Sequence, residues 1–538
     1  MNNPDVLIVG AGCTGVMAAR TLADAGLRVL VLDGGVRDNH YSAIQPQQDF
    51  ISLRSSDEEQ HRYFLGDAFE SLPQGNIGTG AQLTPARRYL IEHTERLLPL
   101  LSQNFSPVES LAEGGLGGGW GLGCCVFSDA ELEAAGLPAT EMQQACQTVA
   151  NRIGISGNND DASAFTFAHL KNIQPATPPD ALASVLLRKY QSKRSALKQK
   201  GFALGRPALA MLTQDKDHRS ATQLRDMEFY DNSGGSAWRP QVELETLRKH
   251  PNISIESGWM ATRFTQNAEG VNTEAINISS GETKIFSAKR LVLSPGVLGT
   301  ARIVLRSMPG GETTKLPLLC NPYTYMPCIV PSMLGRNMNA RNISYAQLSL
   351  FHDADGMQRD VAMASLYTYR SLLLFRLLRE TPLNFRDARI LQQYLLPALL
   401  IAGIHHPETN GSEQWVKLAA SSSTPTGDLL EANYMRSTEK EKRVQEREQI
   451  YVKALRSIGA WKLKTVHPGN GSSIHYAGCL PFSETEKPFT LHASGRLHGT
   501  SNVYVADGSG FRFLPAKGLT LSLMANAHRV AQNVSNNE

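Results

Sequence analysis

The chain has 538 residues, which suggests roughly two to four domains and is long enough to bury a sizeable core. Hydrophobic residues make up 41% of the sequence and charged residues 19%, a globular composition that excludes a disordered chain. Lys and Arg total 53 against 50 Asp and Glu, so the formal net charge of +3 gives no electrostatic case for a protein that binds nucleic acid or a membrane surface.

The seven cysteines are spread thinly and form no CxxC pair, which favours neither a disulfide framework nor a zinc site. We predict no metal site, and we interpret the adjacent Cys124 and Cys125 as small buried thiols. No signal peptide precedes the first strand-like run, and the apolar stretch 394–404 is too short to span a bilayer. These features predict a soluble protein of the cytoplasm.

The first thirty-odd residues carry the strongest local pattern. Residues 6–9 form a continuous apolar run, as expected for a strand buried on both faces. A G-x-G-x-x-G motif follows, then helical spacing up to Gly26, then a second apolar run that ends at Asp33. Strand, motif, helix, strand and terminal acid in this order predict a dinucleotide-binding unit, although a glycine-rich turn in an unrelated α/β protein is the plain alternative.

Each residue of this unit has a physical role. Gly10 permits the tight turn, Gly12 lets a pyrophosphate approach the backbone, and Gly15 lets helix and strand pack closely. Cys13 and Thr14 begin the helix, whose N-terminal N–H groups attract phosphate. Asp33 is placed to accept hydrogen bonds from ribose hydroxyls. This unit alone does not distinguish FAD from NAD.

A second glycine cluster spans residues 114–123 and holds seven glycines in ten residues. Such a segment cannot form a stable helix or strand interior, so it is either a flexible linker or a stretch of backbone pressed against a flat ligand. An embedded tryptophan and the apolar run 124–127 that follows favour the second interpretation. The residues expected at the cofactor here are Gly115, Gly118, Gly119, Trp120 and Gly121.

The sequence pattern in the middle of the chain predicts short helices and short strands. Helices are expected at 90–98, 177–201 and 240–248, and short strands at 253–255, 260–264, 273–278 and 284–287. The run 290–293 is interpreted as a strand that feeds a helix through a turn at Gly296. Further along, the pattern predicts strands at 344–351, 362–369 and 414–419, and helices at 371–378, 386–396 and 438–458. His405 and His406 are interpreted as capping a turn or lying on the surface, although a strand facing the active site is the alternative.

The last seventy residues contain Ser472–Cys479 (SSIHYAGC), then GRLHGT at 495–500, an Asp507-Gly508 turn and the run LPAKGLT at 514–520. Together with the N-terminal GAGCTG and the glycine cluster, they resemble the glucose-methanol-choline (GMC) family of FAD-dependent oxidoreductases. The resemblance covers both ends and the middle, about half of the chain.

The resemblance implies an α/β fold with a Rossmann-like FAD-binding domain assembled from discontinuous segments. Residues 1–165, 220–314 and 466–538 would build this domain. Residues 166–219 and 315–465 would build a substrate domain, an antiparallel sheet covered by helices. The implied cofactor is FAD.

The resemblance also implies site residues. Asp507 and Gly508 would hold the pyrophosphate and ribityl portion of FAD, and the helix that begins near Gly518, Leu519 and Thr520 would aim its N-terminal dipole at the flavin. His475 matches the active-site histidine of the family, and its imidazole suits proton abstraction at neutral pH. The alternative for His475 is a purely structural histidine.

One position departs from the family pattern. A second His or Asn is expected about ten residues after the terminal Asp, and Gly518 stands there instead. Its neighbour Lys517 is a candidate cation for a developing alkoxide or for the flavin, and a salt bridge is the equal alternative.

The predicted function is oxidation of an alcohol or sugar hydroxyl to a carbonyl, with proton abstraction by His475 and hydride transfer to flavin N5. The electron acceptor is left open among oxygen, a quinone and a protein. One alternative is a flavoenzyme of the same fold with other chemistry, such as a lyase, a decarboxylase or a C=C oxidoreductase. The other is a non-catalytic or membrane-peripheral FAD-binding protein, suggested by the apolar segments 371–378 and 394–404, although we expect these segments to be core or lid helices.

Overall fold

The N-terminal apolar run forms the central strand of a parallel sheet, as its pattern predicts. The computed structural model describes residues 4–44, 46–69, 85–337, 341–368 and 384–536. The sheet has the strand order β25-β13-β1-β2-β9, all parallel. The strands are β1 (Val6–Val9), β2 (Val29–Asp33), β9 (Ile253–Ser257), β13 (Arg290–Leu293) and β25 (Val503–Val505). The sheet therefore joins both ends of the chain to its middle.

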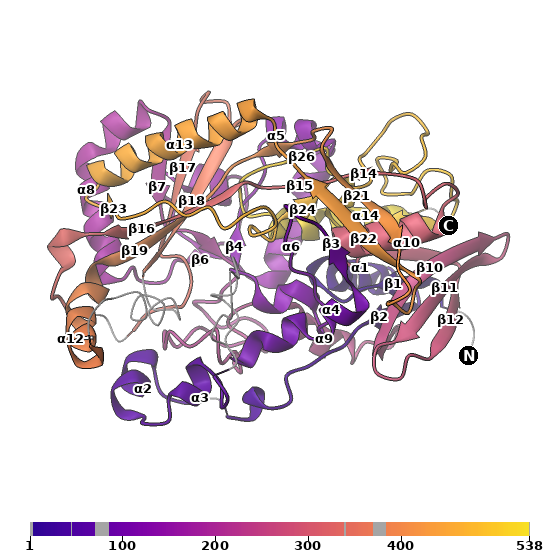
Figure 1. Cartoon of the computed structure of the whole chain (residues 1–538), viewed down its shortest axis with the longest axis horizontal. Coiled ribbons are helices and arrows are strands. Elements are labelled where there is room, and N and C mark those ends of the chain that lie inside the picture. The colour runs from indigo at the N-terminus through magenta and orange to yellow at the C-terminus, as the bar shows by residue number, and fades with distance from the viewer. Residues whose placement is uncertain (1–3, 45, 70–84, 338–340, 369–383, 537–538) are drawn as a thin grey trace.

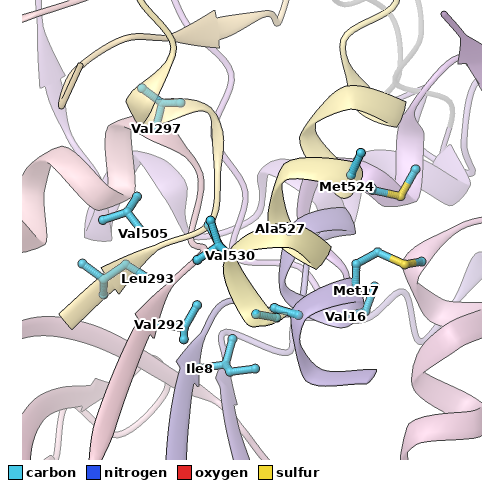
Figure 2. Packing of buried hydrophobic residues seen from close by; sticks show 14 of the residues in the cluster. Ile8, Val16, Met17, Val292, Leu293, Val297, Val505, Met524, Ala527 and Val530 are labelled. Atoms are coloured by element: carbon cyan, nitrogen blue, oxygen red, sulfur yellow. The ribbon is translucent and has the colours of Figure 1, made fainter. Parts of the chain in front are cut away.

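Three helices pack on this sheet to build the core of the α/β half. They are α1 (Cys13–Asp24), α10 (Val297–Ser307) and the C-terminal α14 (Thr520–Asn536). Figure 2 shows Ile8 and Val292 of the sheet near Met17 of α1 and Val530 of α14. A buried contact of 2.6 Å between Thr21 Oγ1 and His528 Nδ1 also joins α1 to α14. The two ends of the chain therefore share one core.

A three-stranded antiparallel sheet extends from the α/β half (Figure 1). Its strands are β10 (Trp259–Asn267), β11 (Gly270–Asn277) and β12 (Thr283–Ala288). They confirm the short strands predicted in this region, and each strand is longer than its sequence pattern indicated.

The other half of the molecule is built on a six-stranded antiparallel sheet (Figure 1). In spatial order its strands are β23 (Trp461–Lys462), β16 (Tyr323–Ile329), β19 (Leu399–His405), β18 (Val361–Thr368), β17 (Leu348–Asp353) and β7 (Phe202–Gly205). Helices α8 (Ala181–Lys198) and α13 (Thr438–Ser457) pack on one face through Leu186 and Leu455. The predicted antiparallel sheet covered by helices is confirmed.

Side chains alternate across this sheet with the period of two that strands require. On β18, Ala362, Ala364 and Leu366 join the core under the helices. Met363, Ser365 and Tyr367 point to the opposite face, where they line a large cavity. The cavity therefore lies between the second face of this sheet and the α/β half.

Smaller elements complete the described structure. A four-stranded sheet joins β14 (Leu316–Pro317), β21 (Gln414–Ala420), β22 (Asp428–Tyr434) and β3 (Leu100–Leu101). Another four-stranded sheet joins β4 (Gly123–Cys124), β8 (Ala208–Leu209), β5 (Ser156–Gly157) and β6 (Gln174–Pro175). Two strand pairs are β15 (Leu319–Cys320) with β24 (Tyr476–Ala477), and β20 (Glu408–Thr409) with β26 (Phe513–Leu514). Further helices are α2 (Phe50–Ser56), α3 (His61–Phe64), α4 (Thr94–Leu97), α5 (Asp129–Ala135), α6 (Ala139–Ile153), α7 (Ser163–Thr166), α9 (Pro240–Leu247) and α12 (Phe385–Leu395).

Two predicted helices differ in the structure. The segment 90–98 is broken into a 3-10 helix, Pro85–Ile91, and the single turn α4, because His93 between them adopts a left-handed conformation with φ +64°. The apolar segment 394–404 was expected to be a core or lid helix, but α12 ends at Leu395 and strand β19 follows. The predicted helix 371–378 lies outside the described residues. Across the described ranges, no helix combines the length and apolar character that crossing a bilayer requires.

Candidate active site

A cavity of about 1280 Å³ runs from the carboxyl ends of the parallel strands to the open face of the six-stranded sheet. Pockets for one small ligand usually have roughly 300–1,000 Å³. The cavity is therefore large enough for an extended cofactor together with a second molecule. Its wall includes residues from both glycine clusters and from the C-terminal motif.

The first glycine motif is packed so tightly that two of its positions admit no side chain. A Cβ atom on Gly15 would lie 1.8 Å from the carbonyl oxygen of Gly10, so Gly15 serves the contact of α1 with β1 and does not line the cavity. Gly10 has φ +91°, and a Cβ there would lie 2.7 Å from the oxygen of Ser294. Gly12, whose nearest neighbour would be 3.8 Å away, leaves open space on the cavity side.

Helix α1 presents its N-terminus to the cavity. Its N-cap residue is Gly12, no side chain caps the helix, and the first turn holds no acidic residue. Cys13 and Thr14 both line the cavity. An uncapped helix N-terminus with its positive dipole end is a suitable site for phosphate groups.

Asp33 lies at the end of β2 and also lines the cavity. Its Oδ1 accepts a hydrogen bond from the Ala11 N–H at 2.8 Å, and its Oδ2 accepts one from the Gly35 N–H at 3.1 Å. Burial raises the pKa of the Asp33 carboxyl to about 7, although both backbone hydrogen bonds oppose this shift. The carboxyl is thus held in one orientation and keeps acceptor capacity for a ligand hydroxyl.

The second glycine cluster contains a 3-10 helix, Gly115–Gly119, that lies against α1 and α9. Gly115, Gly119, Trp120 and Gly121 line the cavity, whereas Gly118 instead faces the Tyr89 hydroxyl, 2.9 Å from where its Cβ would be. The Trp120 indole donates to the Trp238 carbonyl oxygen at 2.9 Å. The cluster is thus a packed wall and not a flexible linker.

The C-terminal turn is held from inside the protein. Asp507 Oδ2 accepts from the Thr300 hydroxyl at 2.6 Å, and Oδ1 accepts from the Ser509 N–H and hydroxyl at 3.0 and 2.6 Å. Asp507 and Gly508 both line the cavity. The Asp507 carboxylate therefore shapes the turn through which the backbone meets a ligand.

The departure at Gly518 has a steric cause. A Cβ at Gly518 would lie 2.7 Å from the backbone oxygen of Gly123 in the second glycine cluster. No larger side chain fits there without moving that backbone. Leu519 and Thr520, at the start of α14, line the cavity beside it.

His475 is oriented by the strand pair β15–β24. Because Cys320 pairs with Tyr476 in antiparallel register, Asn321 lies opposite His475. The Nδ1 atom of His475 is 3.0 Å from Asn321 Oδ1. His475 lines the cavity, and no hydrogen bond of its Nε2 is found among the described residues. Burial lowers the pKa of His475 to about 4, so its imidazole is neutral at physiological pH.

His405 at the end of β19 stacks on His475, with ring centroids 4.8 Å apart and planes 20° apart. On its other side lies the ring of Tyr323, at 4.6 Å. Burial lowers the pKa of His405 well below its usual value, and the neighbouring His475 and His406 add to the shift. The interpretation of His405 as a capping or surface residue is therefore wrong. The sequence of 399–405 gives no signal for this placement, because nearly all of its residues are apolar and show no polar alternation.

Lys517 is not where a catalytic cation would be needed. Its ammonium group is fully buried, forms an ion pair with Glu131 at 2.7 Å, and donates to Val126 O at 3.2 Å and Gln358 Oε1 at 3.0 Å. It is absent from the cavity wall. The salt bridge alternative is the one found, although in the interior and not at the surface, and a direct role of Lys517 in catalysis is not supported.

The groups that the α/β half presents to the cavity fit a flavin dinucleotide. An uncapped helix N-terminus, an Asp carboxyl at the end of the second strand and two glycine segments, with no room for a side chain at Gly10, Gly117 and Gly119, border one continuous cavity. The described residues contain no group of three or more His, Cys, Asp or Glu side chains able to hold a metal ion. Both Cys124 and Cys125 are buried free thiols, as predicted.

Comparison with known proteins agrees with this geometry. A family model described as an FAD binding domain matches residues 5–320, and one described as GMC oxidoreductase matches residues 416–527. The chain is 22% identical to paromamine 6'-oxidase of Streptomyces fradiae over 557 aligned residues, covering 99% of this chain and 91% of that protein. The crystal structure of pyridoxine 4-oxidase from Mesorbium loti has a similar fold, with a TM-score of 0.58, 14% identity and complete coverage of both chains.

Proposed function

The chain belongs to the GMC family of FAD-dependent oxidoreductases, and from this premise we propose that it oxidises the CH–OH group of a small-molecule alcohol to a carbonyl. The observation that carries the proposal is the pair of stacked neutral imidazoles, His475 and His405, on the cavity wall. The two relatives bear the names of oxidases of small molecules, which supports the same substrate class here.

Asn321 determines which nitrogen of His475 accepts a proton. The Asn321 amide nitrogen donates to three carbonyl oxygens, those of His406, Leu514 and Pro515, at 2.8, 3.2 and 3.2 Å. The amide oxygen must therefore face His475, and since it only accepts, the Nδ1 of His475 carries the hydrogen. The Nε2 is left unprotonated.

Nε2 of His475 is therefore the base in our proposal, and it takes the hydroxyl proton of the alcohol. Bound FAD supplies the acceptor for the hydride of the same carbon, so two electrons and two hydrogens leave the substrate together. The groups that would hold FAD are Asp33, the N-terminus of α1, both glycine clusters, the Asp507 turn and the start of α14.

In our proposal, His405 takes over the role of the second His or Asn of the family pattern, whose position in this chain is occupied by Gly518. Its ring lies between Tyr323 and His475, so packing fixes its plane. A neutral imidazole carries one N–H donor and one acceptor nitrogen, and either one suits a substrate hydroxyl. His405 therefore orients the alcohol while His475 takes the proton.

The remaining assignments belong to the same proposal. We keep the division into an FAD domain of residues 1–165, 220–314 and 466–538 and a substrate domain of residues 166–219 and 315–465. All seven cysteines are free thiols, which supports a reducing compartment such as the cytoplasm.

The test is anaerobic reduction of the FAD-loaded protein by pools of alcohols and sugars, followed by absorbance. An active pool bleaches the flavin of the wild-type protein. His475→Ala is expected to keep FAD and to lower the reduction rate by a factor on the order of 10² or more. His492→Ala is the matched control, because this exposed histidine contacts Ser494 outside the cavity. Unchanged reduction in His475→Ala would remove His475 as the base, and bleaching by no alcohol would remove the proposed reaction.

A further inference from the structure

Arg87 is a buried cation on the cavity wall that forms no ion pair with the residues that the structure describes. Its side chain belongs to the 3-10 helix Pro85–Ile91, is only 2% exposed and lines the cavity. Within the described residues, Nε, Nη1 and Nη2 all lack a partner of acceptable geometry. The remaining buried arginines of the cavity wall differ in this respect, since Arg302 pairs with Glu109 and Arg306 pairs with Asp428.

The surroundings of Arg87 are aromatic, with a second arginine and the Tyr345 hydroxyl close by, and the Asp226 carboxyl lies on the same cavity wall. The guanidinium lies over the Phe229 ring, 4.2 Å from its centroid. The nearby Tyr345 hydroxyl accepts a hydrogen bond from Arg239 Nη2 at 3.0 Å, and the Arg239 Nε also lacks a partner. The Glu228 carboxylate in this region is occupied by the Ser344 N–H and hydroxyl at 2.9 Å.

Arg87 remains charged under ordinary conditions. Burial, and then the positive charge of Arg239, lower its pKa to about 10, which is still far above neutral pH. A buried charge without a partner is costly, so such a group in a binding cavity indicates a ligand of opposite charge. The planar fork of arginine matches the two oxygens of a carboxylate or phosphate.

We propose that Arg87, supported by Arg239, binds a carboxylate or phosphate group of the substrate, so that the enzyme acts on alcohols that carry an acidic group. This inference rests on the proposed function and names the substrate class of the same cavity. Phe229 and Tyr345, which surround Arg87, also line the cavity. Tyr345 lies shortly before β17, whose neighbour β18 pairs in register with β19 at His405.

The phosphates of FAD are the other possible source of such an anion. Their expected site is the uncapped N-terminus of α1 with Gly12, whereas the 3-10 helix that carries Arg87 meets the second glycine cluster at Gly118 through Tyr89. Neither Phe229 nor Tyr345 belongs to the glycine clusters or to the Asp507 turn. The position of Arg87 therefore favours the substrate, and the experiment separates the two sources.

The experiment measures ligand binding to the FAD-loaded protein by calorimetry. The probes are matched acid and amide pairs, benzoate with benzamide and hexanoate with hexanamide, and phenyl phosphate with phenol. We expect at least one acid to bind roughly ten- to a hundredfold more tightly than its neutral partner, the range of a hydrogen bond to a charged group. Arg87→Met is expected to abolish this preference, and Arg87→Lys to retain part of it.

The control is Arg263→Met, because Arg263 is exposed on β10 and away from the cavity. It should keep the full preference. The ligand-free Arg87→Met protein should melt at the same temperature as the wild type or higher, since an unpaired buried charge is removed. A lower melting temperature would indicate a structural arginine and would contradict the proposal.

Three further results would overturn the inference. They are a wild-type protein that prefers no acid, a preference that survives in Arg87→Met, and loss of FAD from Arg87→Met, which would assign the arginine to the cofactor phosphates. Binding is read without any flavin reduction. A failure of this binding experiment can therefore be distinguished from a failure of the proposed alcohol oxidation, which the bleaching experiment tests.

Discussion

The two halves of the cavity hold their ligands by different means. On the α/β side the wall is mostly backbone: glycines, a helix N-terminus and a carboxyl that is itself fixed by two N–H groups. On the side of the antiparallel sheet the wall is made of side chains, among them His405, Tyr323 and Tyr367. The tightly packed glycines of the backbone wall, such as Gly10 and Gly119, exclude a Cβ atom, whereas a side-chain wall can change its chemistry while its shape is kept. The two halves should therefore respond differently to substitution.

The largest effect is expected directly behind the backbone wall, at Gly15, which holds helix α1 against β1. Gly15→Ala places a Cβ 1.8 Å from the Gly10 oxygen, so helix α1 cannot keep its contact with β1. We expect loss of bound FAD and of the folded protein, measured by flavin content and thermal melting. Gly234→Ala is the control, since its Cβ would meet only the Ser220 Cβ at an ordinary 3.6 Å. Normal FAD binding by Gly15→Ala would refute the distinction between the two walls.

The next effect concerns a buried ion pair behind the cavity. Lys517→Met leaves the Glu131 carboxylate buried without its cation, which is expected to cost about 3–5 kcal/mol of unfolding free energy. Urea unfolding measures the loss, and the double variant Lys517→Met with Glu131→Leu should recover most of it. The folded fraction should reduce its flavin at the normal rate. A slower reduction with unchanged stability would return Lys517 to the catalytic site.

A smaller effect is expected on the side-chain wall. His405→Phe keeps a ring between Tyr323 and His475 but removes both nitrogens. Stability should change little, while flavin reduction by an active alcohol should slow by about tenfold to a hundredfold. Stopped-flow absorbance measures the rate. If the variant reduces its flavin normally, His405 serves packing alone.

The smallest effect is expected from pH in the neutral range. The pKa of His475 is lowered to about 4, so the base is neutral and competent throughout pH 6–8. Protonation removes the base, and kcat/KM should therefore fall only as the pH drops through about 4. A profile of kcat/KM between pH 3.5 and 8 measures this. A fall centred near pH 6.5 would show a solvated histidine and would contradict the buried orientation.

The cofactor side of the site could be predicted because its determinants are adjacent in sequence. Strand, glycine motif, helix and Asp33 lie within the first 33 residues, and each part constrains the next. The packing role of Gly15 follows from the same motif, since its close contact is with Gly10. The position of Gly118 was less predictable, because it faces Tyr89 and does not line the cavity.

The substrate side depends on pairings that a single sequence does not reveal. His405 meets Tyr323 because β16 and β19 pair in one register, with 81 residues between these two positions. Its segment contains so few polar residues that the strand alternation was hidden, and the run was interpreted as a helix. Arg87 shows no motif at all. Its burial depends on Phe229 and Tyr345, which lie far along the chain.

The sharing of one sheet by both ends of the chain has a consequence for biosynthesis. β25 is the outer strand beside β13, and α14 closes the core against α1, so the pocket wall at 507–520 is made last. A ribosome adds about 5–20 residues per second, so the first glycine motif waits roughly half a minute to two minutes for helix α14. FAD thus meets a complete site only after residues 507–520 have been synthesised. A chain that stops before residue 507 is expected not to hold its flavin.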